Sequence, residues 1–429
     1  MNNRVVVTGI GVIAPNGSSV AEFREALIEG RSGIRKVEGL AEHGFQCQVG
    51  GVPQGAAAIA ERLFTEEQRL AMNGNMTYAC IAASEAWEDA GLTRPDPAAD
   101  TVDWHMGAVI GTGIGGLDTV AERIVPLTDA GKVRRLGSTC VEQVMSSNVS
   151  AKIGGLFGLG NRVTTNSSAC TTGTEAIYDA FCRVRSGAAR RMLAGSSEGH
   201  SHYIWAGFDA MRVLARGFND TPEEASRPMS ASASGFVPGS GAGVLVLESL
   251  ESALERGADI RAEILGGDVN CGGHRMGGSM TAPNPTGVKR CIRAAMEEAG
   301  IEPRDVDAIS GHLTATIADP LEIRNWAEAL GCAPEDLPPI TATKSLVGHA
   351  LGAAGSIEAV AAILMLERGF LHAARNCEDL HPDIQAYAGA IPHETRELPE
   401  MRTMIKAGFG FGDVNGCLVL RKWDAATLN

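Results

Sequence analysis

The sequence predicts an α/β fold built from layers of helices and strands. Short β-branched runs alternate with Ala-rich helical stretches through most of the chain, which is typical of largely parallel sheets buried on both faces. The expected strands cover residues 4–8, 106–110, 162–166, 191–194, 243–247, 308–310 and 417–420. The expected helices cover residues 76–90, 172–186, 285–299 and 356–367. The first strand is expected to end in a Gly-rich turn.

Two segments of the chain end in the same way, which indicates an internal duplication. The runs GSGAGVLVLE and GFGDVNGCLVL both join a Gly-rich turn to an apolar strand. A soft boundary falls between them, at Leu250–Ala258, where a strand gives way to a charged helix. We therefore expect two similar halves, residues 1–252 and 253–429.

The composition excludes several classes of function. The 429 residues are 44% hydrophobic and 21% charged, as in ordinary soluble proteins, and the net charge of -14 comes without a basic stripe that would bind nucleic acid. The ten cysteines show no C-x-x-C spacing and are interpreted as reduced thiols. The start lacks a cleavable signal pattern, and the apolar stretch at 357–366 is too short to span a bilayer. A cytoplasmic location is expected.

Cys170 is the candidate nucleophile. In RVTTNSSACTTGTEAIYDAF it follows a predicted strand and precedes a predicted helix, with Gly173 allowing close approach of a backbone or a ligand. The positive end of the helix would favour the thiolate, which is the form that attacks. A buried structural cysteine is the alternative interpretation for this segment.

Two histidines form the second part of the predicted site. In TATKSLVGHALGAAGSIEAV, a tight turn separates Lys344 from His349, and Glu358 is a plausible partner for the lysine. In SGHLTATIADPLE, His312 follows a strand directly, and Thr314, Thr316 and Asp319 could orient it. Either histidine could instead be structural.

The loop in IKAGFGFGDVNGCLVL precedes the last strand. Gly410 and Gly412 free the backbone N–H groups around Phe411, so that the loop could supply an oxyanion donor. A plain hairpin turn is the alternative.

Taken in order, these segments resemble the active-site set of the beta-ketoacyl-acyl carrier protein synthases of the thiolase fold. The resemblance covers nearly the whole chain and includes VVVTGIGVIAPNG, GTGIGGL at 111–117, SRP at 226–228 and GFVPGSGAG at 235–243. It is closest to type II elongating enzymes and to ketosynthase alpha subunits. It implies a five-layer αβαβα fold of two similar halves, with the cysteine in the first half and the histidines and lysine in the second.

The resemblance also implies a decarboxylative Claisen condensation. Cys170 would carry the acyl group, and His312 and His349 would hold the enolate formed from malonyl-acyl carrier protein. Lys344 would set the electrostatics with Glu358, and Phe411 would serve as oxyanion donor and gate. It implies no metal and no cofactor, because the substrates ride on the phosphopantetheine of an acyl carrier protein. A homodimer, or a heterodimer with a chain-length-factor-like subunit, is expected.

Carrier docking in the family uses cationic side chains around the entrance of the site. The matching positions here are Arg69, Arg134, Arg135 and Arg212. Exposed arginines are otherwise solvated charges of little energetic consequence.

Departures from the family pattern suggest a specialised substrate. Leu313 replaces a glycine after His312, at a cost of about 1–2 kcal/mol if the backbone is left-handed there, so we expect a rebuilt loop. Small residues, Ser230, Ala233 and Ser240 among them, replace an internal charge network. The pattern GHLTAT followed by DPLE resembles that of ketosynthases from aryl polyene and flexirubin pigment pathways.

Three other functions stay open. The first is housekeeping fatty-acid elongation, and the second is a non-catalytic chain-length factor, which would lack the active cysteine. The third is thiolase chemistry on coenzyme A, which needs a second catalytic cysteine that Cys417, inside a predicted strand, fits poorly. The patterns GTGIGG at 111–116 and GSSEG at 195–199 are interpreted as strand-ending turns rather than as a dinucleotide site or a nucleophile elbow.

Overall fold

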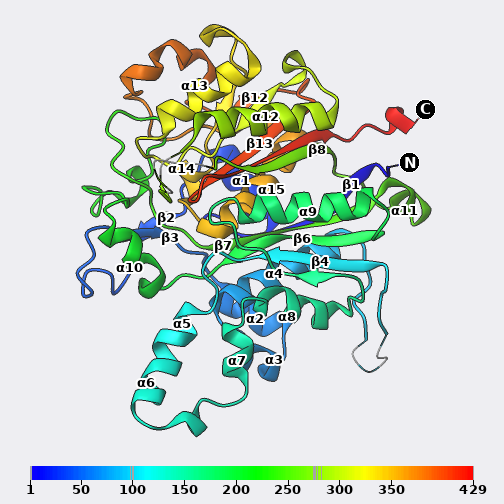
Figure 1. Cartoon of the computed structure of the whole chain (residues 1–429), viewed down its shortest axis with the longest axis vertical. Coiled ribbons are helices and arrows are strands. Elements are labelled where there is room, and N and C mark those ends of the chain that lie inside the picture. Colours follow the sequence, from blue (N-terminus) through cyan, green and yellow to red (C-terminus); the bar gives the residue numbers. More distant parts are fainter. Residues whose placement is uncertain are drawn as a thin grey trace.

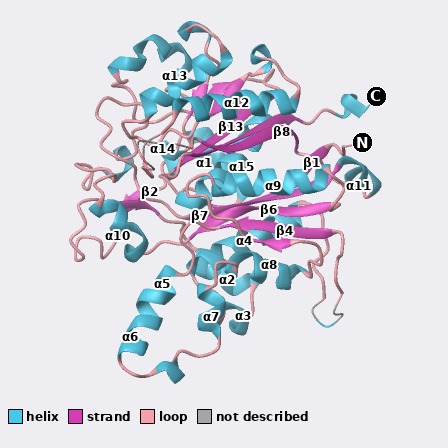
Figure 2. Cartoon of the chain, in the orientation of Figure 1, coloured by secondary structure: helices cyan, strands magenta, loops and turns pink. Residues whose placement is uncertain are grey.

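A computed structural model of the chain describes residues 2–96, 98, 101–273, 277, 279–281 and 283–428. Helices and half-sheets alternate in five layers, and both chain ends lie on the same side (Figure 1). The strands of the two half-sheets run across the middle of the molecule with helices between and outside them (Figure 2). The thiolase-like αβαβα prediction is confirmed.

Each half-sheet contains five strands in the same spatial order. In the first, the order is β5-β4-β6-β7-β1, and in the second it is β10-β9-β13-β14-β8. Numbered along the chain within each half, both read 3-2-4-5-1, with matching parallel and antiparallel neighbours. The strands of the first half are β1 (Val5–Ile13), β4 (Met106–Gly111), β5 (Val163–Thr164), β6 (Arg191–Glu198) and β7 (Gly241–Ser249). Those of the second are β8 (Ala262–Cys271), β9 (Ala308–Ser310), β10 (Ile340–Thr341), β13 (Thr403–Gly410) and β14 (Val414–Lys422).

The half-sheets join through a short antiparallel pairing of Val5–Val7 with residues 262–264. Two small hairpins lie outside them, β2 (Ile34–Lys36) with β3 (Val49–Gly51) and β11 (Phe370–Leu371) with β12 (Arg396–Glu397). The repeated strand order is what an internal duplication would produce. The boundary between residues 252 and 253 stays a prediction.

The helices fall into three layers. The central layer is α9 (Thr172–Arg185) and α15 (Ala354–Arg368), which contact strands of both half-sheets. One outer layer holds α12 (Pro285–Ala299) and α13 (Asp319–Leu330), and the other holds α4 (Gly74–Asp89) and α8 (Asn148–Phe157). The remaining helices are α1 (Val20–Glu29), α2 (Ala56–Leu63), α3 (Glu66–Leu70), α5 (Leu117–Thr119), α6 (Val125–Asp129), α7 (Thr139–Val144), α10 (His202–Ala210), α11 (Leu250–Glu255) and α14 (Lys344–Val347).

Three expectations about the strands are wrong. The sheets are mixed rather than largely parallel, because β1, β7, β8 and β14 pair antiparallel. Strand β1 does not turn after Thr8 but runs to Ile13, where the glycines admit helix α4. A Cβ at Gly9 would lie 2.2 Å from the Ala86 carbonyl oxygen. Likewise Gly195–Glu198 is strand, although β4 does end at Gly111 as predicted.

Within the described ranges, no helix is both long enough and apolar enough to cross a membrane.

Candidate active site

Cys170 lies where the two central helices meet. Its segment leaves β5, turns at Ala169 with a left-handed φ of +50°, and enters α9 two residues after the cysteine. Helix α15 approaches closely because the second residue of each helix is glycine. A Cβ at Gly173 would lie 2.5 Å from the Ser356 nitrogen, and one at Gly355 would lie 2.6 Å from the Thr174 nitrogen. The small residues of both helices therefore bring the cysteine against the segment that carries the lysine and the second histidine.

His349 contacts the cysteine directly. Its Nε2 lies 3.1 Å from Cys170 Sγ, and its Nδ1 accepts a hydrogen bond of 3.1 Å from the Leu351 backbone N–H. Because Nδ1 is an acceptor, the proton of the neutral ring must be on Nε2. His349 therefore presents an N–H group to the sulfur.

His312 is oriented in the same sense by Lys344. The lysine Nζ lies 3.4 Å from His312 Nδ1 and donates a 2.6 Å hydrogen bond to the His312 carbonyl oxygen. An ammonium group can only donate, so Nδ1 is again the acceptor and Nε2 carries the proton. The two imidazole rings lie 5.5 Å apart between centroids at 86°. The site thus holds two N–H donors near one sulfur.

Lys344 forms an ion pair with Glu358, and both side chains are 2% exposed. The predicted pairing is confirmed. Burial first, and then the Lys344 charge, hold the pKa of His312 and of His349 well below the ordinary value. Both rings are therefore neutral at physiological pH and act as hydrogen-bond donors through Nε2.

Burial opposes the thiolate that the sequence led us to expect at Cys170. Burial raises the pKa of the Cys170 thiol to about 11, although the Lys344 charge and a hydrogen bond from the Phe411 backbone lower it. Desolvation of a sulfur anion outweighs the field of the helix end.

The Gly-rich loop lies against the cysteine. A Cβ at Gly410 would lie 3.0 Å from the Cys170 nitrogen, so a larger residue there would push the loop away from the cysteine. Gly412 has a left-handed φ of +84°, which turns the chain into β14. The Phe411 ring lies 6.4 Å from the ring of Phe208 on α10. Phe411 therefore supplies both a backbone donor at the sulfur and an aromatic ring at the site.

The loop after His312 is held by two buried carboxylates. Glu322 accepts the backbone N–H groups of His312 (2.7 Å) and Leu313 (2.8 Å), and Asp319 accepts those of Thr314 and Ala315. Leu313 and Ala315 have positive φ angles of 22° and 62°. Asp319 therefore shapes the backbone, whereas the predicted role of orienting the histidine falls to Lys344.

The segment at 229–240 is held by a carboxylate from a distant part of the chain. Asp379 accepts hydrogen bonds from the Ser230 hydroxyl and the Ser232 backbone, and it pairs with Arg227 at 3.4 Å. Asp379 is 42% exposed, so this ion pair lies at the surface. Ser240 donates a 3.2 Å hydrogen bond to the Gly51 carbonyl oxygen.

The four arginines assigned to carrier docking differ in availability. Arg134 and Arg135 lie fully exposed in a short 3-10 turn, and Arg212 is exposed after α10. Arg69 on α3 contacts Glu61 at 3.6 Å and has a buried Nε, so its charge is partly committed.

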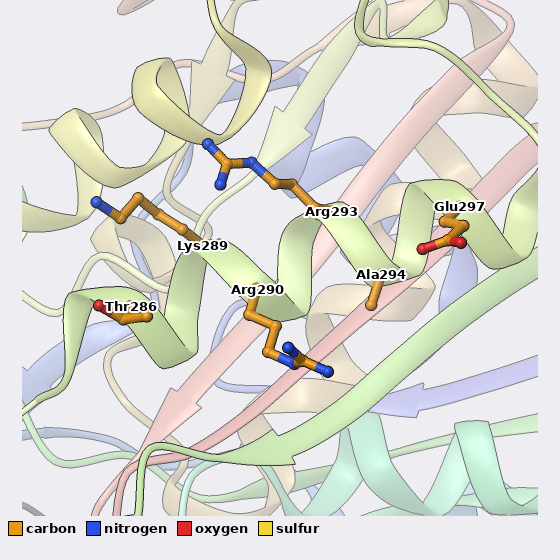
Figure 3. Close-up of a pocket in the computed structure, with 6 residues that line it drawn as sticks. All are labelled: Thr286, Lys289, Arg290, Arg293, Ala294 and Glu297. Atoms are coloured by element: carbon orange, nitrogen blue, oxygen red, sulfur yellow. The ribbon is translucent and has the colours of Figure 1, made fainter.

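A separate cationic groove of about 510 Å³ lies along α12. Lys289, Arg290 and Arg293 project from this outer helix, as Figure 3 shows. Lys289 pairs with Glu328, and Arg293 donates to the carbonyl oxygens of Glu328 and Ala329 on α13. Two of the three cations are therefore occupied in joining helices.

Two buried side chains of the site were not found from the sequence. Glu198 accepts backbone N–H groups from Gly113, Ile114 and Gly352, which ties the GTGIGG loop to the segment after His349. Lys406 lies fully buried beside Glu358. The sequence did contain a signal for Lys406, because it is a lone lysine inside the apolar run that precedes the Gly-rich loop.

The cysteine sulfur and the two imidazoles could also be considered as metal ligands. Their ligand atoms lie within 4.8 Å of one another. However, Lys344 Nζ lies 3.4 Å from His312 Nδ1, and its positive charge opposes the binding of a divalent cation there. The arrangement is better suited to holding an anionic oxygen.

Comparison with known proteins decides the family. The model of the beta-ketoacyl synthase N-terminal domain matches residues 2–253, and the model of its C-terminal domain matches residues 261–378. The chain belongs to the beta-ketoacyl synthase family. Such enzymes condense acyl groups by acyl transfer, and the recognition from sequence motifs is confirmed.

Curated relatives of this beta-ketoacyl synthase match over almost its whole length. It is 35% identical to the chloroplastic 3-oxoacyl-[acyl-carrier-protein] synthase I of Arabidopsis thaliana over 96% of this chain and 85% of the relative. It is 34% identical to 3-oxoacyl-[acyl-carrier-protein] synthase 2 of Staphylococcus aureus N315 over 99% of both chains. It is also 34% identical to synthase 1 of Escherichia coli K12 over 98% of this chain and 99% of the relative.

Solved structures also match this beta-ketoacyl synthase over almost its whole length. A beta-ketoacyl synthase from Burkholderia phymatum STM815 superposes with a TM-score of 0.89 at 29% identity, over 98% of this chain and all of the other. A type II polyketide ketosynthase, solved with its acyl-carrier protein and bound to the hexaketide, gives 0.86 at 30%, over 99% of this chain and all of the other. The ishigamide ketosynthase/chain length factor gives the same values.

Proposed function

We propose that this beta-ketoacyl synthase elongates an unsaturated or aromatic polyketide chain on acyl carrier protein, through Cys170, His312 and His349. The observation that carries the residue roles is the pair of Nε2–H groups beside one sulfur, each fixed by a donor at the opposite ring nitrogen. Neutral donors of this kind stabilise an anionic oxygen without a metal.

The first half-reaction transfers the acyl group. Cys170 Sγ attacks the thioester carbonyl, the carrier thiol leaves with the proton, and the acyl group remains on the cysteine as a thioester. Because the pKa of the thiol is about 11, the attack requires its proton to leave as the bond forms. The backbone N–H groups of Cys170 and Phe411 would hold the tetrahedral oxygen.

The second half-reaction forms the carbon–carbon bond. The malonyl thioester loses carbon dioxide, and the electron pair of the broken bond moves to the thioester oxygen as an enolate. The Nε2–H groups of His312 and His349 hold that oxygen. The enolate carbon then attacks the acyl carbonyl, and the carbon–sulfur bond to Cys170 breaks. The sulfur takes up one proton from solvent, which restores the thiol, and the 3-ketoacyl chain leaves on the carrier.

Two observations support a specialised substrate. The loop beside His312 has non-glycine residues at positive φ, and each needs a buried carboxylate to hold its backbone. One of the similar solved structures is a type II polyketide ketosynthase by its title, and another is a ketosynthase/chain length factor. The curated relatives are 3-oxoacyl-[acyl-carrier-protein] synthases, so housekeeping fatty-acid elongation is the second candidate.

The chain-length-factor interpretation is disfavoured by the intact site. Cys170 contacts His349, and the lysine–glutamate pair behind them is in place. Thiolase chemistry is also disfavoured, because Cys417 is fully buried in β14 and packs near Cys291.

The test is intact-protein mass spectrometry after mixing the enzyme with a panel of acyl carrier proteins. Saturated and polyunsaturated acyl groups of equal length form the matched pairs. Faster acylation of Cys170 by the unsaturated member, followed by condensation with malonyl carrier, supports the proposal. Equal turnover of both members favours housekeeping elongation, and no acylation of a folded enzyme favours the structural subunit.

A further inference from the structure

Lys406 is a second buried lysine behind the condensing site. It lies on β13, is fully buried, and reaches toward helices α9 and α15. Its Nζ donates a 2.6 Å hydrogen bond to Thr174 Oγ1 and lies 3.2 Å from Glu358 Oε2. The same carboxylate pairs with Lys344 through its other oxygen, Oε1.

The cluster of Lys344, Glu358 and Lys406 has an unusual charge balance. Two lysines share one carboxylate, so the three side chains carry a net charge of +1 when both lysines are protonated, while each is at most 2% exposed. Burial lowers the pKa of Lys406, and the Glu358 charge raises it. Burying an unbalanced charge costs free energy, and an apolar residue of similar volume would be cheaper at position 406. A lysine kept at such a cost is more readily explained by a task at the site than by stability.

The surroundings of the cluster indicate that task. Thr174 belongs to the first turn of α9, four residues after Cys170, and Glu358 belongs to the helix that follows His349. The charge of Lys406, like that of Lys344, lowers the pKa of both histidines. The other charged or titratable groups facing this region include Glu322 on α13, which binds the His312 backbone, and Cys417 on β14. His372, which follows β11, and Cys170 itself also interact with Glu358.

We propose that Lys406 is a positioning residue of the condensing site: it holds Glu358 through the oxygen that Lys344 leaves open and keeps both histidines neutral donors. The inference rests on the proposed roles of His312 and His349. An unbalanced positive charge behind two imidazoles disfavours their protonation, so Nε2–H stays a neutral donor as the pH falls. The same charge stabilises the enolate oxygen that forms in front of them.

The activity test uses Lys406→Met, which keeps the length and volume of the side chain and removes its charge. The rate of condensation is measured from pH 5 to pH 8 with saturating malonyl carrier. We expect the rate at pH 5.5, divided by the rate at pH 7.5, to be about three- to tenfold lower in the variant than in the wild type. The reason is that removing the charge raises the pKa of the histidines. A residue with only a structural role would lower the rate equally at all pH values. Lys289→Met, which removes a surface charge on α12, is the matched control and should keep the wild-type profile.

A stability cycle tests the charge cluster without any activity. Glu358→Gln leaves two buried ammonium groups without a counter-charge, so its thermal unfolding midpoint should drop sharply. Adding Lys406→Met to that variant should restore part of the loss, whereas Lys406→Met alone should remain folded. An unchanged pH profile in folded Lys406→Met, or a double variant no more stable than Glu358→Gln, would overturn the proposal for Lys406. If the folded wild-type enzyme showed no condensation at any pH, that result would instead refute the proposed roles of the histidines.

Discussion

His349 Nε2 lies 3.1 Å from Cys170 Sγ, and the Leu351 backbone N–H occupies the other nitrogen of the ring. This relationship fixes the tautomer, so that the histidine is a donor to the sulfur and to any anion that forms beside it. With Nε2 protonated, His349 does not act as a base toward the thiol. The proposed chemistry therefore depends on donated hydrogen bonds more than on proton abstraction by His349.

The first prediction concerns the division of labour between the cysteine and the histidines. His312→Ala and His349→Ala should each lower kcat for condensation by at least about 100-fold, because each removes one donor from the enolate oxygen. In both variants the transfer of the acyl group to Cys170 should persist. Intact-protein mass spectrometry measures this transfer. His105→Ala, an exposed position, is the control. A condensation rate within tenfold of wild type in either variant would contradict the enolate assignment.

The second prediction concerns the acidity of the nucleophile. With the pKa of Cys170 raised to about 11, the rate of its alkylation by iodoacetamide should rise about tenfold per pH unit between pH 7 and pH 9. Peptide mass spectrometry separates Cys170 from the exposed Cys271, which serves as the internal reference. A rate that levels off below pH 8.5 would mean that the helix end and Lys344 outweigh burial after all.

The third prediction concerns the loop after His312. Ala315→Gly removes a positive-φ cost of about 1–2 kcal/mol and loses little buried surface, so the unfolding midpoint should stay the same or rise. Leu313→Gly relieves similar strain but empties a fully buried site, which costs about 2–5 kcal/mol, so its midpoint should fall. Differential scanning calorimetry compares the two. Equal destabilisation by both would show that the loop carries no backbone strain.

The fourth prediction concerns carrier docking. Replacing Arg134 and Arg135 with glutamate should raise KM for acyl carrier protein about tenfold and weaken its salt dependence, with kcat preserved. Arg290→Glu in the α12 groove, at a distant exposed position, is the control; it reverses one charge and is compared with Arg134→Glu and Arg135→Glu made singly. If the α12 variant alone raised KM, the docking surface would lie on the second half of the molecule.

Much of the fold was predictable because its signals are local. The alternation of apolar strands with Ala-rich helices defines the layers, and strand β9 and helix α12 have the predicted bounds. What failed depended on partners far away in sequence. Gly9 looked like a turn residue, yet it lies in a strand because α4 passes within contact of its backbone. Likewise the partner of Ser230 is Asp379, almost 150 residues away, which no local pattern indicates.

For the site, the sequence by itself predicted which residues to propose for the chemistry, since Cys170, His312, Lys344 and His349 each lie in a segment that resembles a family motif. The tertiary structure alone decided how they act. Burial against α9 and α15 raises the pKa of the thiol, and a backbone amide and an ammonium group choose the tautomers of the two rings. Only the crossing of β13 over those helices brings Lys406 to Glu358. Protonation states follow from desolvation and from charges within a few ångströms, and a linear sequence does not contain those distances.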